Sequence, residues 1–166
     1  MSHKILISVG SNVDKEHNTH SGLQALNCAY GELVISTIFE SESVGFKGSN
    51  FLNLVVKAQT VDSIASVCKL LKQIEDKHGR VRDKKFANRT LDLDLLTYDQ
   101  QVCKEPVVLP RAEIEYNAFV LKPMAEIVPN DIHPLTGKTY AQLWQEFSNE
   151  QQRLWPSGMQ WSNAAT

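Results

Sequence analysis

The sequence lacks any long apolar run: none of its 166 residues lies in a stretch approaching the roughly 18 apolar residues that a membrane span requires. It also lacks a surplus of basic residues, because 17 Lys and Arg stand against 19 Asp and Glu, for a net charge of -2. Generic binding to nucleic acid or to an acidic membrane needs such a surplus. The first apolar run, residues 5–9, is too short for a signal peptide and is followed at once by polar residues. We therefore expect neither a membrane nor a nucleic-acid partner.

Cysteine is scarce as well, with Cys28, Cys68 and Cys103 far apart and no CxxC pair. An odd number of widely spaced cysteines argues against a disulfide framework or a structural zinc site. Unpaired thiols are typical of a reducing compartment, so a cytoplasmic protein is expected. The histidines are scattered without the spacing of metal ligands, and we expect them at the surface.

The common signatures of nucleotide-binding and hydrolytic enzymes are missing. There is no GxGxxG, GxSxG or HExxH sequence, and Gly10-Ser11-Asn12 lacks both the lysine and the upstream glycine of a Walker A loop. A nucleotide site in this protein would have to be of another kind.

What is present predicts one domain over residues 1–166, with 42% hydrophobic residues to form its core. Apolar and β-branched runs predict strands, and apolar residues at helical spacing predict helices. The strands are expected at 4–9, 33–39, 51–60 and 91–98, and the helices at 15–30 and from an Asp62 cap to about His78. The order βαββαβ is that of the ferredoxin-like α+β fold, an antiparallel sheet with both helices on one face.

The C-terminal part differs from this core. Repeated prolines between Pro106 and Pro134 limit its helices to short ones, expected at 119–127 and 140–147. The last fifteen residues look loosely held. The stretch from Glu40 to Asn50 is rich in Gly and Ser, and is a loop long enough to suggest a functional role.

The strongest chemical signal is the pair Asp92 and Asp94. Side chains alternate along a strand, so Leu91, Leu93 and Leu95 should face the core and the two aspartates the opposite side. Their Cα atoms would lie about 7 Å apart, close enough for both carboxylates to bind the same metal ion or two adjacent ions. A solvated strand face would give the same pattern and remains the alternative.

A basic segment stands just before this pair, with Arg80, Arg82, Lys84, Lys85 and Arg89. Cations beside paired carboxylates suit a polyphosphate, because magnesium bridges carboxylate and phosphate oxygens while guanidinium groups bind the remaining charge. A surface loop with weak ion pairs is the alternative explanation.

Taken together, the motifs resemble those of the 6-hydroxymethyl-7,8-dihydropterin pyrophosphokinases, over about residues 4–145. The matching pieces, in family order, are S8-V-G-S-N12, E40-S-E-S-V-G45, F51-L-N53, I74-E75, G79-R-V-R82, R89-T-L-D-L-D94, Pro110 and A118-F-V-L-x-P-x-A-E-I127. The segment R-T-L-D-L-D, with G-R-V-R before it, is the most specific of them.

The resemblance implies transfer of pyrophosphate from ATP to the hydroxymethyl group of a reduced pterin, leaving AMP, in folate biosynthesis. It implies two Mg²⁺ ions on Asp92 and Asp94, which with Arg80 and Arg89 would be the catalytic residues. It assigns ATP binding to Glu75, Arg80, Arg82, Arg89, Leu95 and Arg111, and pterin binding to Ser41, Val44, Phe51, Asn53, Phe86 and Phe119. The partners would be small molecules, the chain a monomer, and folate-pathway enzymes its possible neighbours.

The sequence departs from the family pattern at a few positions. Arg111-Ala112 stands where the family usually has a histidine, and Asn117 where it has an arginine. Phe86 replaces a common tryptophan, and Ser43 a usual proline. Two of these changes alter charge near the expected triphosphate, which leaves open a paralogue with the same pocket but low activity or another pterin substrate.

Two further classes of protein fit the sequence less well. A nucleic-acid-binding ferredoxin-like domain would need paired aromatics on its central strands and a basic surface, and the sequence has neither. A two-metal nuclease would explain Asp92 and Asp94 but not the combination of Asn53 with two aromatic residues.

Overall fold

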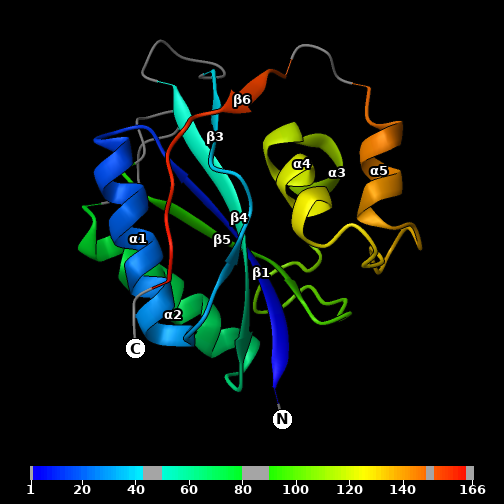
Figure 1. Cartoon of the computed structure of the whole chain (residues 1–166). Coiled ribbons are helices and arrows are strands. Elements are labelled where there is room, and N and C mark those ends of the chain that lie inside the picture. Colours follow the sequence, from blue (N-terminus) through cyan, green and yellow to red (C-terminus); the bar gives the residue numbers. More distant parts are fainter. Residues whose placement is uncertain (1, 43–49, 80–89, 149–151, 164–166) are drawn as a thin grey trace.

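The computed structural model describes residues 2–42, 50–79, 90–148 and 152–163. Figure 1 shows a central sheet with helices on two sides. The strands of the predicted core are β1 (His3–Ser11), β2 (Val34–Ile35), β3 (Phe39–Ser41), β4 (Phe51–Thr60) and β5 (Asp92–Tyr98), and its helices are α1 (Lys15–Tyr30) and α2 (Ile64–Lys77). The C-terminal part adds α3 (Glu113–Tyr116), α4 (Ala118–Ile127), α5 (Tyr140–Glu146) and β6 (Leu154–Pro156).

The sheet confirms the predicted ferredoxin-like arrangement. Its strand order is β5-β1-β4-β3-β6, with β2 also pairing with β4, and every pairing is antiparallel. The first strand of the chain, β1, therefore lies inside the sheet, between β5 and β4. This placement brings the ends of β1, β4 and β5 side by side.

Each face of the sheet has its own apolar core. Ile7 and Leu93 pack with Leu23 of α1 and Leu71 of α2 on the face that the two long helices cover. On the opposite face Leu6, Val55 and Leu96 pack with residues of the C-terminal helices, such as Met124 of α4. The core helices do lie on one face, as predicted, and the short helices of the C-terminal extension cover the other (Figure 1).

Two local predictions were wrong. The expected strand 33–39 is divided into β2 and β3, because the Ser36 hydroxyl accepts a hydrogen bond from the Val55 N–H at 3.0 Å and the regular ladder is interrupted there. The cap of α2 is Ser63 rather than Asp62. Ser63 has extended backbone angles, and its hydroxyl accepts from the Ser66 N–H, as an N-cap residue does.

The expectation of a loosely held C-terminus was also wrong for residues 152–163. β6 pairs with β3 and lengthens the sheet by one strand. Further on, the Asn163 side chain accepts from the Leu33 N–H at 2.8 Å and donates to the Leu33 carbonyl at 3.0 Å. Polar side chains attach this segment to backbone groups, so an apolar sequence pattern could not have predicted it.

One histidine is not at the surface. His133 is fully buried, and its Nδ1 accepts hydrogen bonds from the N–H groups of Leu135 and Thr136, both at 3.2 Å. It organises the turn before α5. In the described part of the chain, no helix combines the length and the apolar character needed to cross a membrane.

Candidate functional site

Asp92 and Asp94 lie at the start of β5, on the face opposite the α1–α2 core. Leu91, Leu93 and Leu95 are at most 4% exposed and pack in that core, so the predicted alternation is confirmed. The two carboxylates share the other face of the strand and are both partly exposed.

Asp94 is an unusual carboxyl group. Burial raises its pKa, the negative charge of Asp92 raises it further, and the result is a value of about 6, although Arg111 opposes the shift. Arg111 Nη2 lies 3.7 Å from Asp94 Oδ1, and Arg111 Nε donates to Glu113 Oε2 at 3.0 Å. Two like charges forced together on one strand make a site that a cation would stabilise.

A cavity of about 280 Å³ lies beside this pair. α2, β5 and the segment before α3 line it with both apolar and charged side chains. The lining residues are Cys68, Leu71, Lys72, Glu75, Leu93, Asp94, Leu95, Pro106, Val107 and Arg111. The three described ATP-binding candidates, Glu75, Leu95 and Arg111, therefore meet in one cavity.

Glu75 is held in place by the backbone of the site strand. It is only 4% exposed, and its Oε2 accepts a hydrogen bond from the Leu93 N–H at 2.8 Å. Since Leu93 stands between Asp92 and Asp94, Glu75 fixes α2 against the part of β5 that carries the carboxylate pair.

A glycine separates the carboxylates from the candidate pterin residues. Gly10 of β1 is paired with Asp92 on one side and with Asn53 on the other, so the three residues form one row across β5, β1 and β4. A Cβ atom at Gly10 would meet the Asn53 Nδ2 at 3.1 Å and the Asp92 Cβ at 4.0 Å. Two strand spacings place the Cα atoms of Asp92 and Asn53 about 10 Å apart.

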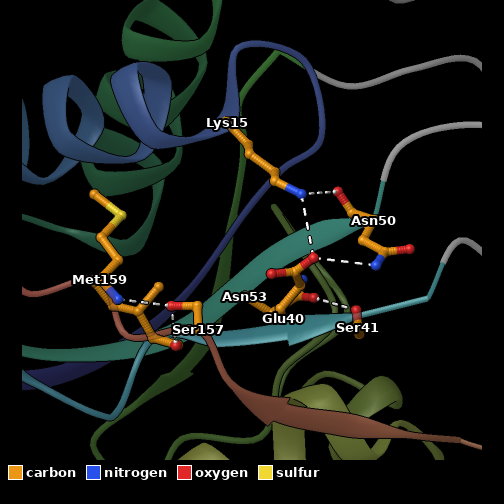
Figure 2. Close-up of polar contacts among 8 residues, drawn as sticks. Lys15, Glu40, Ser41, Asn50, Asn53, Ser157 and Met159 are labelled. Atoms are coloured by element: carbon orange, nitrogen blue, oxygen red, sulfur yellow. Dashed lines mark hydrogen bonds and ion pairs between the residues drawn. The ribbon is translucent and has the colours of Figure 1, made fainter.

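The Asn53 amide has a fixed orientation. Asn53 and Ser41 are each 6% exposed, and the Ser41 hydroxyl donates to Asn53 Oδ1 at 2.7 Å (Figure 2). With its oxygen engaged by Ser41, Asn53 directs its Nδ2 toward the space above Gly10. The structure thus brings the substrate-binding candidates Ser41 and Asn53 together.

Phe51 and Phe119 belong to the same side of the sheet. Phe51 is two residues before Asn53 in β4 and therefore shares its face. Phe119, the second residue of α4, packs on the core cluster that covers this face. Both rings are partly exposed.

Sequence reasoning missed Lys15, the first residue of α1. Its Nζ lies 3.4 Å from both Glu40 Oε2 and the Asn50 carbonyl oxygen, and Asn50 Nδ2 donates to Glu40 Oε2 at 3.0 Å (Figure 2). Lys15 thus joins β3 to the start of β4 beside Ser41. A lone lysine at a helix start gives no sequence signal for such a contact.

The remaining candidates lie outside the described residues: Arg80, Arg82, Arg89, Val44 and Phe86, together with Ser43, Lys84 and Lys85. Asn117 is described, and it is the N-cap of α4 without a side-chain capping bond. It does not line the cavity beside Asp94.

The carboxylate pair suits magnesium in its chemistry. Magnesium prefers oxygen ligands, and it commonly takes one or two carboxylates while water and substrate phosphates complete its shell. Within the described ranges no group of three or more His, Cys, Asp and Glu residues is placed to hold a metal ion. Asp92 and Asp94 therefore offer a partial shell, which is what a metal that arrives with a polyphosphate needs.

Fold and site together define a ferredoxin-like α+β domain with an acidic pair and a buried amide on one sheet face, and a cavity that reaches Asp94 from the side of α2. A sequence model described as 7,8-dihydro-6-hydroxymethylpterin-pyrophosphokinase (HPPK) matches residues 6–129, and the chain belongs to this family.

Curated relatives agree with this assignment. The chain is 37% identical over 109 residues to a 2-amino-4-hydroxy-6-hydroxymethyldihydropteridine pyrophosphokinase of Synechocystis, a match that covers 65% of this chain and 56% of the relative. It is 31% identical over 132 residues to a protein of the same name in Bacillus subtilis, covering 76% and 79% of the two chains. For the Synechocystis relative, the chain thus spans little more than half of its length.

Solved structures show the same fold. The HPPK-DHPS protein of Plasmodium falciparum, crystallised with pteroate, superposes with a TM-score of 0.72 at 12% identity, over 88% of this chain and 42% of that one. This likeness supports the architecture, including the sheet that carries the acidic pair.

Proposed function

We propose that this protein transfers pyrophosphate from ATP to 6-hydroxymethyl-7,8-dihydropterin, giving the pterin diphosphate and AMP for folate biosynthesis. The observation that carries the proposal is the row Asp92–Gly10–Asn53. The row places two features about 10 Å apart on one sheet face: an acidic pair suited to metal ions that accompany a polyphosphate, and a buried amide. A small heterocycle held by Asn53 would extend its substituent toward the carboxylates.

ATP is proposed to bind in the cavity between α2 and β5. Leu71, Leu95 and Val107 give it an apolar lining for the flat base, and Arg111 and Lys72 add positive charge to the same lining. The phosphates are proposed to lie near Asp94, which also lines the cavity. Arg80, Arg82 and Arg89 are proposed to contact the triphosphate, as the family resemblance implies.

The pterin is proposed to lie over Gly10. The Asn53 Nδ2 would donate to an acceptor at the edge of the ring, and Ser41 fixes the amide so that this donor is presented. Phe51 and Phe119 are proposed to stack on the two faces of the ring, with Val44 and Phe86 completing the site. A flat amide-like heterocycle needs such π faces and a few edge donors.

Asp92 and Asp94 are proposed to hold two Mg²⁺ ions, which would neutralise the charge that develops on the phosphates. The protein's own residues act mainly by positioning. Glu75 fixes the strand that carries the pair, and Arg111 supplies a permanent positive charge beside it. Placement and electrostatic stabilisation account for most of the catalysis in phosphoryl transfer.

The oligomeric state, the compartment and the partners are proposed as well. We propose a monomeric single-domain protein of the cytoplasm that acts on small molecules. Association with other folate enzymes is part of the proposal, because a relative in Lactococcus lactis is named "Bifunctional protein FolKE".

The decisive experiment measures AMP release from ATP with and without 6-hydroxymethyl-7,8-dihydropterin, at saturating magnesium. AMP should form only when the pterin is present. Asp92→Asn should reduce turnover by at least about 100-fold, since electrostatic groups of this kind contribute on the order of 3–4 kcal/mol. Asp62→Asn, which changes an exposed carboxylate at the other end of the sheet, is the matched control. Pterin-independent AMP formation, or full activity in Asp92→Asn, would refute the proposal.

A further inference from the structure

Gln152 joins two helices through both ends of its side-chain amide. Its Oε1 accepts a hydrogen bond from the Ala118 N–H at 2.6 Å, and its Nε2 donates to the Tyr116 carbonyl at 2.8 Å. Tyr116 is the last residue of α3 and Ala118 is the first residue of α4. The residue lies beyond residue 129, where the family match ends.

The first turn of α4 depends on this contact. The N-terminal N–H groups of a helix have no partner within the helix, and here the cap residue Asn117 makes no side-chain capping bond. Pro123 lies inside the same helix, so it cannot donate the usual i→i−4 bond to the carbonyl of Phe119. Gln152 supplies, from a distant part of the chain, an acceptor for the first of these N–H groups, that of Ala118.

The same C-terminal segment is fixed to the other wall of the proposed pterin pocket. Two residues after Gln152, Leu154 of β6 is paired with Ser41 of β3, whose hydroxyl orients Asn53. Figure 1 shows β6 between β3 and the layer that contains α3 and α4. The Ser157 hydroxyl then donates to the Ile38 carbonyl at 2.6 Å, which secures the end of β6 beside β3.

We propose that Gln152 is a positioning residue for the pterin substrate. It fixes the first turn of α4, and with it the Phe119 ring, at a set distance from the sheet face that carries Ser41 and Asn53. The inference rests on the proposed function, because it takes Phe119 and Asn53 as pterin ligands. It adds a role for the segment 152–157, which thus joins the two walls of the pocket.

The test is the steady-state kinetics of Gln152→Ala, with pterin and ATP varied in turn. The KM for the pterin should rise about 5- to 10-fold, as expected when one well-formed hydrogen bond is lost. The KM for ATP and kcat should stay within about twofold, because the cavity beside Asp94 receives no residue from this segment. Gln160→Ala, at an exposed glutamine just after this segment, is the matched control and should change neither constant.

Gln152→Glu provides a second variant in case Gln152→Ala folds poorly. It keeps an acceptor for the Ala118 N–H at the start of α4, where a negative charge is favourable, and it loses only the donor to the Tyr116 carbonyl. Its pterin KM should therefore lie closer to wild type than that of Gln152→Ala. If the pterin KM rises equally in Gln152→Ala and Gln152→Glu, the capping role is overturned.

Phe119→Ala separates the inference from the proposed function. If Gln152 acts through Phe119, adding Gln152→Ala to Phe119→Ala should raise the pterin KM by less than twofold. If the two substitutions raise the pterin KM additively, the inference is overturned and the pocket assignment stands. The same holds if the ATP KM rises together with the pterin KM in Gln152→Ala. A Phe119→Ala variant with wild-type pterin KM would refute the pocket itself.

Discussion

Arg111 contacts two acidic residues from different elements at once. Its Nη2 lies 3.7 Å from the Asp94 Oδ1 in β5, and its Nε donates at 3.0 Å to the Glu113 Oε2 in α3. Its backbone N–H donates to the Leu96 carbonyl at 3.0 Å, so the main chain is fixed as well. The guanidinium group is therefore fixed beside the carboxylate pair, and it keeps its charge at every working pH.

Replacing Arg111 with histidine should make nucleotide binding depend on pH. An imidazole with a reference pKa of about 6.5 loses its charge between pH 6 and 8, whereas arginine does not. The dissociation constant of an ATP analogue should therefore increase more over this range for Arg111→His than for wild type. Arg111→Lys, which keeps the charge, is the control. Parallel pH curves for wild type and Arg111→His would show that position 111 does not contact the phosphates.

Asp94→Asn should stabilise the fold while it removes activity. Burial and Asp92 raise the Asp94 pKa to about 6, above the unfolded value of about 3.9. The stability linked to the protonated form is present below about pH 4 and is lost as the pH rises through about 6. Asparagine does not titrate, so the gain in Tm should be largest above pH 6 and vanish near pH 4. Melting curves in EDTA test this, and a lower Tm at pH 8 would contradict the electrostatic account.

Gly10→Ala should weaken pterin binding, because its Cβ would lie 3.1 Å from the Asn53 Nδ2. Displacing a fixed amide by such a contact costs about 1–3 kcal/mol, which corresponds to roughly 5- to 150-fold in affinity. The effect is measurable as the dissociation constant of a pterin analogue. Unchanged affinity would mean that the ring does not lie over Gly10.

Gly22→Ala is a control for the general effect of adding a methyl group. At this site in α1 the new Cβ would meet the Leu91 methyl carbons at 2.9 and 3.0 Å. The better helix propensity of alanine, about 1 kcal/mol, offsets part of an overpacking cost of about 1–3 kcal/mol. Tm should fall slightly, and pterin affinity should stay the same.

The predictable parts of the molecule are those governed by local periodicity. Leu91, Leu93 and Leu95 alternate with Asp92 and Asp94, so the buried and exposed faces of β5 follow from the sequence. The break between β2 and β3 does not, because it depends on a hydrogen bond from Val55, in another strand, to the Ser36 hydroxyl.

In the site, too, some residues follow from local sequence patterns and others depend on contacts with distant parts of the chain. Asn53 and the acidic pair could be chosen from motifs, but Lys15 and Gln152 act through contacts with distant backbone or side-chain groups. The fixing of the Asn53 amide by Ser41 likewise requires β3 and β4 to be paired in the right register. Contacts of this kind leave no periodic signal, so only the three-dimensional structure reveals them.

His133 should make stability depend on pH in the opposite sense to Asp94. Burial lowers its pKa below the ordinary value of 6.5, although the charge of Glu115 acts in the other direction. As the pH falls below about 6.5, the unfolded chain takes up a proton before the folded chain does, so stability decreases. Protonated Nδ1 could no longer accept from Leu135 and Thr136.

The variant His133→Asn tests this, because an amide oxygen can accept the same backbone hydrogen bonds and does not titrate in this range. Its Tm at pH 7.5 should be lower, since a buried ring that stacks edge-on with Tyr140 at 6.1 Å is removed. Between pH 7.5 and 5.5, however, its Tm should fall less steeply than that of wild type. His17→Asn, at an exposed position in α1, should keep the wild-type slope. If His133→Asn and wild type lose stability in parallel over this range, the acid sensitivity of the fold must come from other groups.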